Sequence, residues 1–176
     1  MKGASRGSAV LEPVYFARPA QMLARDLIGA VIVRRVAAAE QRLIITETEA
    51  YLGPHDLACH SARGRTARTE VMFRAPGTLY IYLIYGQHLL CNVVAGPEGA
   101  GAAVLIRSAG EVQGPGRLGK ALALSIELNG LPANPGSQLW FERGRKPRRI
   151  HAARRIGVNY AGRKWSERKL RFIASS

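Results

Sequence analysis

The 176-residue sequence has few cysteines and no long apolar run. Its two cysteines, Cys59 and Cys91, form no CxxC motif and no disulfide framework, so we expect a reducing compartment inside the cell, the cytoplasm or a nucleus. No stretch reaches the ~18 apolar residues that a membrane-spanning helix needs. The opening MKGASRGSAV has no apolar segment behind its basic residues, so a signal peptide is not expected. The sequence therefore predicts no membrane partner.

Acidic residues are also scarce, because 12 Asp and Glu oppose 26 Lys and Arg and leave a formal net charge of +14. Such an excess costs self-repulsion and is typical of proteins that bind a polyanion. Nucleic acid is the leading partner, and a ribosome-like structural role is the alternative. The basic residues do not gather on one long amphipathic helix, which argues against a membrane surface.

The chain is long enough for one domain with a true core, and 47% of it is hydrophobic. Residues 1–12, rich in Gly and Ser, are expected to form a flexible tail, and residues 13–176 a single domain. Hydrophobic patterning predicts helices at residues 19–28 and from Pro115 to a stop at Asn129-Gly130. It predicts strands at residues 29–38, 42–49, 78–84, 88–96 and 102–109, and short strands at 155–158 and 169–173. This mixture indicates an α+β fold.

One stretch, residues 45–68, concentrates the residues that could carry chemistry. The alternation of RLIITETEAY predicts a strand on which Leu43, Ile45, Glu47, Glu49 and Tyr51 share one face. Two acids on an apolar face are costly unless that face opens into a cleft. A strand running out into solvent is the alternative, and the spacing alone leaves both open.

The sequence gives little support for a metal site or for a nucleophilic enzyme. His55, Asp56, Cys59 and His60 are competent ligands, but their spacing does not fit a zinc knuckle and no second pair matches them. We therefore expect no metal, with a metal-dependent hydrolase built on His55, Asp56 and His60 as an alternative. The sequence has no G-x-S-x-G motif, and its lysines lie in charged or terminal contexts where the amine stays protonated.

A carboxylate with nearby aromatic side chains suits the hydrolysis of a bond between a sugar and a flat base. Glu49 can take a proton from a water that attacks a sugar carbon, and its charge favours an oxocarbenium-like transition state. Tyr51, His60 and Tyr82 could sandwich a flat base. Tyr85, at the tip of a hairpin predicted around residues 85–88, could fill the gap that the base leaves in a duplex; Tyr80 is expected to pack in the core.

The quoted segments resemble the alkyladenine (3-methyladenine) DNA glycosylase family. The likeness rests on ETEAYLGPHDLACHSARGRTARTEVMF, GTLYIYLIYGQHLLCNVV, VLIR, GPGRLGKAL and LRF, and it runs from about residue 19 to residue 172. The resemblance implies one compact domain with a curved, mostly antiparallel sheet, flanking helices and a protruding hairpin. It also implies a monofunctional enzyme without cofactor, expected as a monomer, that acts on double-stranded DNA containing damaged purines. Water would cleave the N-glycosidic bond of 3-methyladenine, 7-methylguanine, hypoxanthine or ethenoadenine and leave an abasic site.

The resemblance also assigns roles to individual residues. Glu49 matches the general base and Arg107 the arginine that holds the water, with a further contact from the backbone near Ile156. The base-binding residues would be Tyr51, His60, Tyr82 and Asn92, the last excluding the exocyclic amine of guanine. Tyr85 would intercalate, and Arg65 and Arg117 would lie near phosphates.

The sequence departs from the family at Gln87, where many relatives carry Met beside the inserted tyrosine, which puts in doubt how tightly the duplex gap is filled. Glu47 shares the motif and is expected to support structure, paired with an Arg. A basic nucleic-acid-binding protein without catalysis uses the same arginines and aromatics and is the second alternative. An acid at position 49 argues against it, because a carboxylate in the path of nucleic acid is a liability unless it does chemistry.

Overall fold

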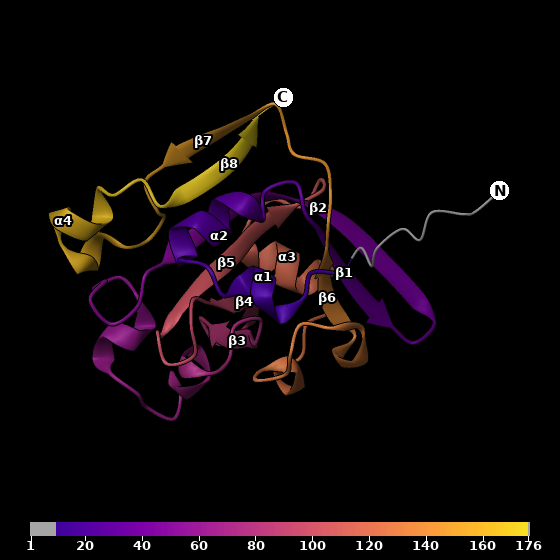
Figure 1. The fold of residues 1–176 in the computed structure, drawn as a ribbon, viewed down its shortest axis with the longest axis horizontal. Coiled ribbons are helices and arrows are strands. Elements are labelled where there is room, and N and C mark those ends of the chain that lie inside the picture. Colours follow the sequence, from indigo (N-terminus) through magenta and orange to yellow (C-terminus); the bar gives the residue numbers. More distant parts are fainter. Residues whose placement is uncertain (1–9, 176) are drawn as a thin grey trace.

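The computed structural model describes residues 10–175, which form an open, curved antiparallel sheet with helices around it (Figure 1). This arrangement confirms the predicted α+β fold. The predicted tail lies outside the described residues up to position 9; the next part packs on the sheet, where Leu11 is buried and donates its amide to the Phe141 carbonyl at 2.8 Å.

The sheet is organised around the longest strand, β2 (Ala39–Tyr51). Its first half pairs with β1, and its second half lies between β5 and β8. The order of hydrogen-bonded strands is β3-β4-β5-β2-β1-β6. In addition, β8 pairs with β2, and β7 pairs with β8. The other strands are β1 (Val31–Val36), β3 (Leu79–Ile84), β4 (His88–Ala95), β5 (Ala102–Ala109), β6 (Leu139–Glu142), β7 (Arg149–Ala153) and β8 (Arg171–Ser175).

A β-bulge in the middle of β2 decides which side chains face the candidate site. The pairing with β5 shifts register between Ile45 and Glu47 and again between Glu47 and Thr48. Ile45 and Thr48 are both fully buried, and the Thr48 hydroxyl donates to the Ala24 carbonyl of α2 at 2.7 Å. The prediction that Leu43 and Ile45 share a face with Glu49 is therefore wrong, because the extra residue of a bulge reverses the alternation.

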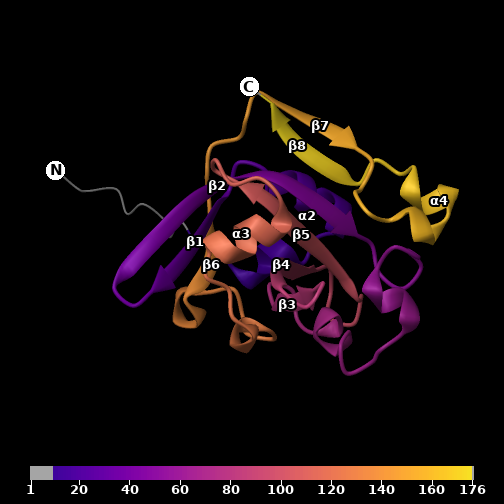
Figure 2. The same cartoon turned by 180° about the vertical axis from the view of Figure 1, so that it is seen from behind.

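Helices cover the sheet from different sides, α2 nearer the viewer in Figure 1 and α3 in Figure 2. The α-helices are α1 (Pro13–Phe16), α2 (Ala20–Asp26), α3 (Pro115–Ala121) and α4 (Arg163–Ser166), and the 3-10 helices are η1 (His60–Arg63), η2 (Glu70–Phe73), η3 (Ile126–Leu128), η4 (Pro135–Ser137) and η5 (Asn159–Ala161). Leu23 and Leu27 of the α2 segment have no exposed surface and join the main core cluster. Burial of each such side chain contributes about 1.5–3 kcal/mol.

Gly29, just after α2, permits a close approach of two chain segments. Its φ is +88°, and a Cβ there would lie 2.4 Å from the Arg145 carbonyl oxygen. Only glycine fits both the left-handed backbone and this contact.

Two other predictions are wrong in detail. The helix from Pro115 ends at Ala121 and not near Asn129, and residues 155–158 form no strand. Strand β7 was not predicted, because RIHAA carries no apolar alternation; it exists through its pairing with β8.

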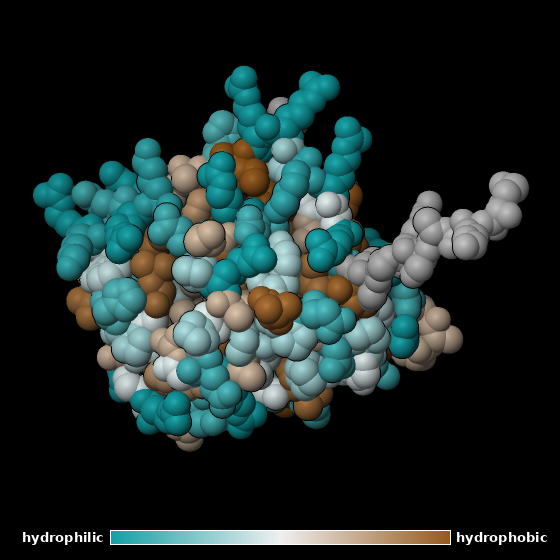
Figure 3. All heavy atoms as spheres, in the orientation of Figure 1, coloured by the Kyte–Doolittle hydropathy of each residue, from teal (hydrophilic) through white to brown (hydrophobic). Residues whose placement is uncertain are grey.

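Hydrophilic side chains project over β7 and β8 on the face seen in Figure 3. Among residues 10–175, no helix has both the length and the apolar character needed to cross a membrane.

Candidate active site

One face of the sheet presents a row of site residues from five neighbouring strands. Antiparallel partners on adjacent strands lie on the same face of a sheet. Following the pairings across the sheet gives the row Tyr80 (β3), Asn92 (β4), Leu105 (β5), Glu49 (β2) and Arg171 (β8). These residues come from positions between 49 and 171 of the chain, and strand pairing brings them together.

Four members of the row, Tyr80, Asn92, Leu105 and Glu49, line a cavity of about 520 Å³. This volume lies within the range of about 300–1,000 Å³ typical of small-molecule sites. Most of the residues predicted for the site line it: Glu49, Tyr51, His60, Tyr82, Tyr85, Asn92 and Arg107. Residues 156–158 and Tyr160 close the side that the sheet leaves open.

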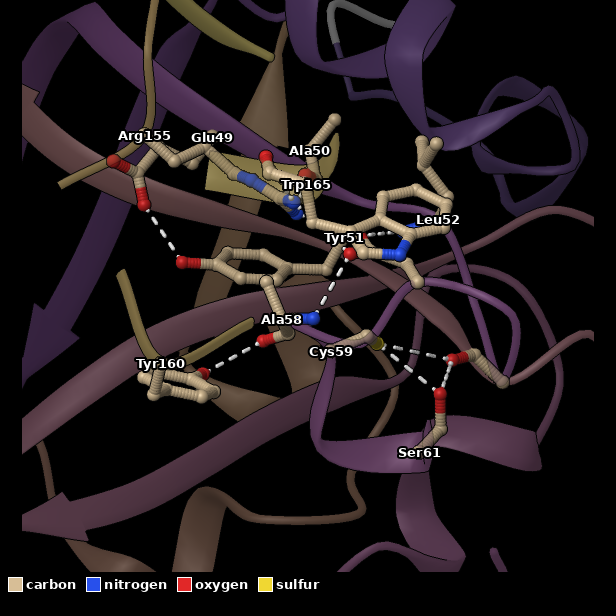
Figure 4. Close-up of polar contacts among 12 residues, drawn as sticks. Glu49, Ala50, Tyr51, Leu52, Ala58, Cys59, Ser61, Arg155, Tyr160 and Trp165 are labelled. Carbon is tan, nitrogen blue, oxygen red and sulfur yellow. Dashed lines mark hydrogen bonds and ion pairs between the residues drawn. The ribbon is translucent and has the colours of Figure 1, made fainter. Parts of the chain in front are cut away.

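Glu49 lies at the bottom of this cavity with no exposed side-chain surface. Its Oε1 accepts the backbone N–H of Ile156 at 2.8 Å and lies 3.4 Å from Nη1 of Arg107. Its Oε2 accepts the hydroxyl of Tyr51 at 2.8 Å (Figure 4). A carboxylate oxygen can accept two hydrogen bonds, so Oε2 keeps one acceptor position for a water or a substrate proton.

Tyr51 is held as a neutral donor to this carboxylate. Burial raises the pKa of Tyr51 well above its usual value, and the charge of Glu49 and the hydrogen bond to it raise this pKa further. The guanidinium of Arg155 lies over its ring, with Cζ 4.9 Å from the centroid. The ring is therefore fixed from behind while it lines the cavity.

Arg107 is fixed by the second acid of the motif. Its Nε donates to Oε1 of Glu47 at 3.2 Å, and Glu47 also accepts Nη1 of Arg171 at 2.9 Å and the Ser108 hydroxyl at 2.8 Å. Burial opposes ionisation of Glu47, but the hydrogen bonds from Arg171 and Ser108 and the charges of the two arginines leave its pKa below the usual value. The expected pairing of Glu47 with an arginine is confirmed.

Three aromatic side chains that line the cavity, His60, Tyr80 and Tyr82, contact one another. The His60 and Tyr82 rings meet edge to face with centroids 4.7 Å apart, and Tyr80 and Tyr82 lie 5.2 Å apart. Nδ1 of His60 lies 3.0 Å from the Tyr80 hydroxyl. Burial, then the charges of Arg68 and Arg63, lower the pKa of His60, which favours the neutral ring. Tyr80, expected as a core residue, is 2% exposed and also lines the cavity.

Tyr85 stands at the tip of the β3–β4 hairpin with 84% of its surface exposed. Tyr85 and Gly86 have φ of +51° and +66°, and the Gln87 amide donates to the Ile84 carbonyl at 3.2 Å. Positive φ at both central residues defines a type I′ turn, whose central positions favour Asn and Gly. A bulky residue kept in this costly conformation is a mark of functional positions.

The two predicted phosphate contacts do not line the cavity. Arg65 follows η1 and places its Cζ 4.8 Å over the Phe73 ring, and Arg117 lies on α3 two residues after the cavity-lining Pro115. Both side chains are exposed.

The residues of the metal alternative have separate partners. Asp56 pairs with Arg155, His60 with Tyr80, and the His55 ring contacts the Trp165 ring at 5.9 Å. Across residues 10–175, no group of three or more His, Cys, Asp or Glu side chains is placed to hold a metal ion.

Two site residues were missed in the sequence. Arg155 fixes Asp56 and Tyr51, and Tyr160, 70% exposed, lines the cavity and donates its hydroxyl to the Ala58 carbonyl at 3.0 Å. Both lie in the Arg-rich segment of residues 143–176. The sequence signal that could have singled them out is the RIGVNYAG run, whose two glycines and aromatic interrupt the basic residues.

Comparison with known proteins adds independent findings. The sequence profile described as methylpurine-DNA glycosylase (MPG) matches residues 14–113 and 110–176. A protein of Myxococcus xanthus (strain DK1622) is 46% identical over 169 residues, 84% of this chain and 81% of its own. One of Methanocella arvoryzae is 39% identical over 87% of this chain and 86% of its own, and one of Legionella pneumophila (strain Paris) 41% identical over 93% and 92%. All three carry the name "Putative 3-methyladenine DNA glycosylase".

Proposed function

The chain belongs to the methylpurine-DNA glycosylase family, enzymes that hydrolyse the N-glycosidic bond of alkylated bases in DNA, and from this premise we propose its substrates, mechanism and site residues. The proposed substrates are 3-methyladenine, 7-methylguanine, hypoxanthine and ethenoadenine in double-stranded DNA. The observation that carries the proposal is the Glu49 carboxylate at the bottom of an aromatic-walled cavity. A monomer acting on DNA inside the cell, without a cofactor, remains our expectation.

In the proposed reaction, a water bound at the free acceptor position of Glu49 Oε2 attacks the anomeric carbon of the deoxyribose. The N-glycosidic bond breaks and its electron pair leaves with the purine, while the proton of the water passes to Glu49. The carboxylate charge, before it takes that proton, favours the oxocarbenium-like sugar. Arg107 holds the other carboxylate oxygen, at 3.4 Å, so that Oε2 faces the water.

The base reaches the cavity by leaving the helix. Extrusion of a base costs a few kcal/mol, least where damage weakens pairing. The rings of Tyr51, His60 and Tyr82 offer flat surfaces for the extruded purine, and Tyr85 would insert where the base was. Aromatic stacking contributes about 1–3 kcal/mol per base.

The experiment that tests the function uses duplexes that each carry one defined lesion. Incubation is in EDTA, followed by alkali, which cleaves the strand at an abasic site. Strand breaks at the lesion, with the free base released, are expected. Binding without any break would leave a DNA-binding protein without catalysis, and loss of activity in EDTA would favour the metal-dependent hydrolase.

The role of Asn92 is tested by its substitution with serine. Asn92 is 3% exposed, lines the cavity, and donates Nδ2 to the Tyr80 carbonyl at 3.1 Å, which fixes its side chain. Removing this bulk should admit the exocyclic amine of guanine, so we expect Asn92→Ser to raise guanine release relative to hypoxanthine about tenfold. Competition between the two substrates in one reaction measures the ratio. Asn129→Ser, whose side chain accepts the Ile81 amide away from the cavity, is the control, and an unchanged ratio in Asn92→Ser would exclude a steric filter.

The phosphate contacts are tested by salt. If the protein neutralises about six phosphates, the slope of log K against log salt should be near −5. In Arg65→Gln and in Arg117→Gln the slope should be less steep by about one unit, near −4. Fluorescence anisotropy of a lesion-bearing duplex between 50 and 400 mM NaCl measures it. Arg35→Gln, on the β1–β2 hairpin, should keep the wild-type slope. Unchanged slopes in both test variants would remove these two assignments.

A further inference from the structure

A buried ion pair behind the cavity is more elaborate than charge neutralisation requires. Nη1 and Nη2 of Arg155 donate to the two Asp56 oxygens at 2.6 and 2.9 Å, and neither side chain has exposed surface. Asp56 also accepts the amides of Leu52 and Ala58, each at 3.1 Å. The pair therefore joins two segments, the loop after β2 and the chain after β7.

The same guanidinium reaches the strand that carries Glu49. Nη1 donates to the carbonyl of Ala50 at 3.0 Å, and Cζ lies 4.9 Å over the ring of Tyr51. Figure 4 shows Arg155 and Trp165 on one side of Tyr51, whose hydroxyl points to Glu49. Arg155 thus supports the group that donates to Oε2.

Arg155 also fixes the group that donates to Oε1, because Ile156 is the next residue. Consecutive Cα atoms are 3.8 Å apart, so a displacement of the Arg155 backbone also displaces the Ile156 amide, which lies 2.8 Å from Oε1 of Glu49. Across the described part of the chain, the backbone of residues 155–157 makes no hydrogen bond to another backbone group, and Gly157 has a φ of +75°. Apart from the Ile156 amide itself, the hydrogen bonds that attach this segment come from the side chain of Arg155.

We infer that Asp56 and Arg155 are positioning residues for the excision step, an inference that rests on the proposed function. They hold the Ile156 amide and the Tyr51 hydroxyl on opposite oxygens of Glu49, which directs the free acceptor position of Oε2 toward the water. Other charged and titratable groups around Glu49 are Arg107 on β5, Arg171 opposite it on β8 and Tyr82 on β3.

Stability alone does not explain this pair. Replacing a buried ion pair with well-packed apolar residues is often neutral or stabilising. Nε of Arg155 is moreover buried without a hydrogen-bond partner, which is itself a cost. What an apolar pair cannot supply is the planar fork, which sets direction as well as distance.

The test is Arg155→Lys, which keeps the charge and loses the fork. We expect the single-turnover rate of base release at saturating enzyme to fall about 10–100-fold, because small misplacements of catalytic groups cost this much. The Kd for lesion-bearing duplex should change less than about threefold. Arg35→Lys, in an exposed pair with Glu40, is the matched control and should leave both the rate of base release and the Kd unchanged.

A second pair of variants tests the link itself. Ile156→Pro removes the amide donor, and Ile156→Ala keeps it. We expect the proline variant to be at least tenfold slower than the alanine variant. Arg155→Lys should slow base release less in the proline background than in the wild type, since part of its effect passes through the Ile156 contact.

Each result of these experiments either supports or overturns the inference. A folded Arg155→Lys that releases the base at the wild-type rate overturns the inference and leaves the proposed function standing. If Arg155→Lys does not fold, equal rates in the two Ile156 variants overturn it, and a slower proline variant supports it. A wild-type protein that releases no base from any lesion defeats the proposed function first, and the inference with it.

Discussion

Glu49→Gln is expected to lower the single-turnover rate of base release about 10³-fold or more. A carboxamide has nearly the same shape, but it cannot take the proton of the attacking water or offset positive charge on the sugar. Binding of a lesion-bearing duplex should persist, because the phosphate contacts and the aromatic walls are unchanged. The measurement pairs a quenched-flow excision assay with anisotropy on the same duplex.

Two matched substitutions on the same strand serve as comparisons for Glu49→Gln. Glu40→Gln changes an exposed acid on the same strand, paired with Arg35, and should leave excision unchanged. Glu47→Gln removes the partner of Arg107 and Arg171 and should cause a smaller, roughly tenfold loss. Excision by Glu49→Gln at the wild-type rate would refute the role of the carboxylate.

Tyr85→Ser should slow excision from duplex DNA about 10–100-fold and change excision from single strands less than threefold. The tyrosine ring, 84% exposed at the tip of the hairpin, would fill the space of the extruded base, which serine is too small to do. In single-stranded DNA an extruded base leaves no gap in a base-paired helix, so insertion of the tyrosine ring gives no advantage there. Rates on the same lesion in the two forms of DNA measure the difference.

The hairpin offers its own controls. Tyr85→Phe keeps the ring and should excise from duplex like the wild type. Gln87→Met adds an apolar side chain beside the tyrosine and should raise affinity for duplex if the gap is loosely filled. Equal losses on duplex and single strand in Tyr85→Ser would remove the wedge role.

A polyanion-binding role without catalysis accounts for the charge but not for the cavity. A surface that only binds phosphates has no use for a buried carboxylate with three donors around it. The hydrogen bonds offset its desolvation, and they also orient it.

Strand and hairpin positions could be predicted from the sequence because alternation and turn residues are local signals. Tyr82, predicted to contact the base, lies on the predicted strand two positions after Tyr80, and both line the cavity. The face of Ile45 was not predicted, because the β2 bulge depends on register with β5, more than 50 residues further along the chain. Likewise, the partner of Asp56 lies 99 residues away, and nothing in its neighbourhood in sequence points to an arginine.

The sequence by itself determined the basic charge, most of the strands and the turn that presents Tyr85, because these follow from residue type and short-range spacing. Its motifs also sufficed for the family resemblance, which the family match confirms. Only the tertiary structure decided which groups surround Glu49. The Ile156 amide, Arg107 and Arg155 come from distant segments, and their approach is fixed by strand pairing and by one buried ion pair.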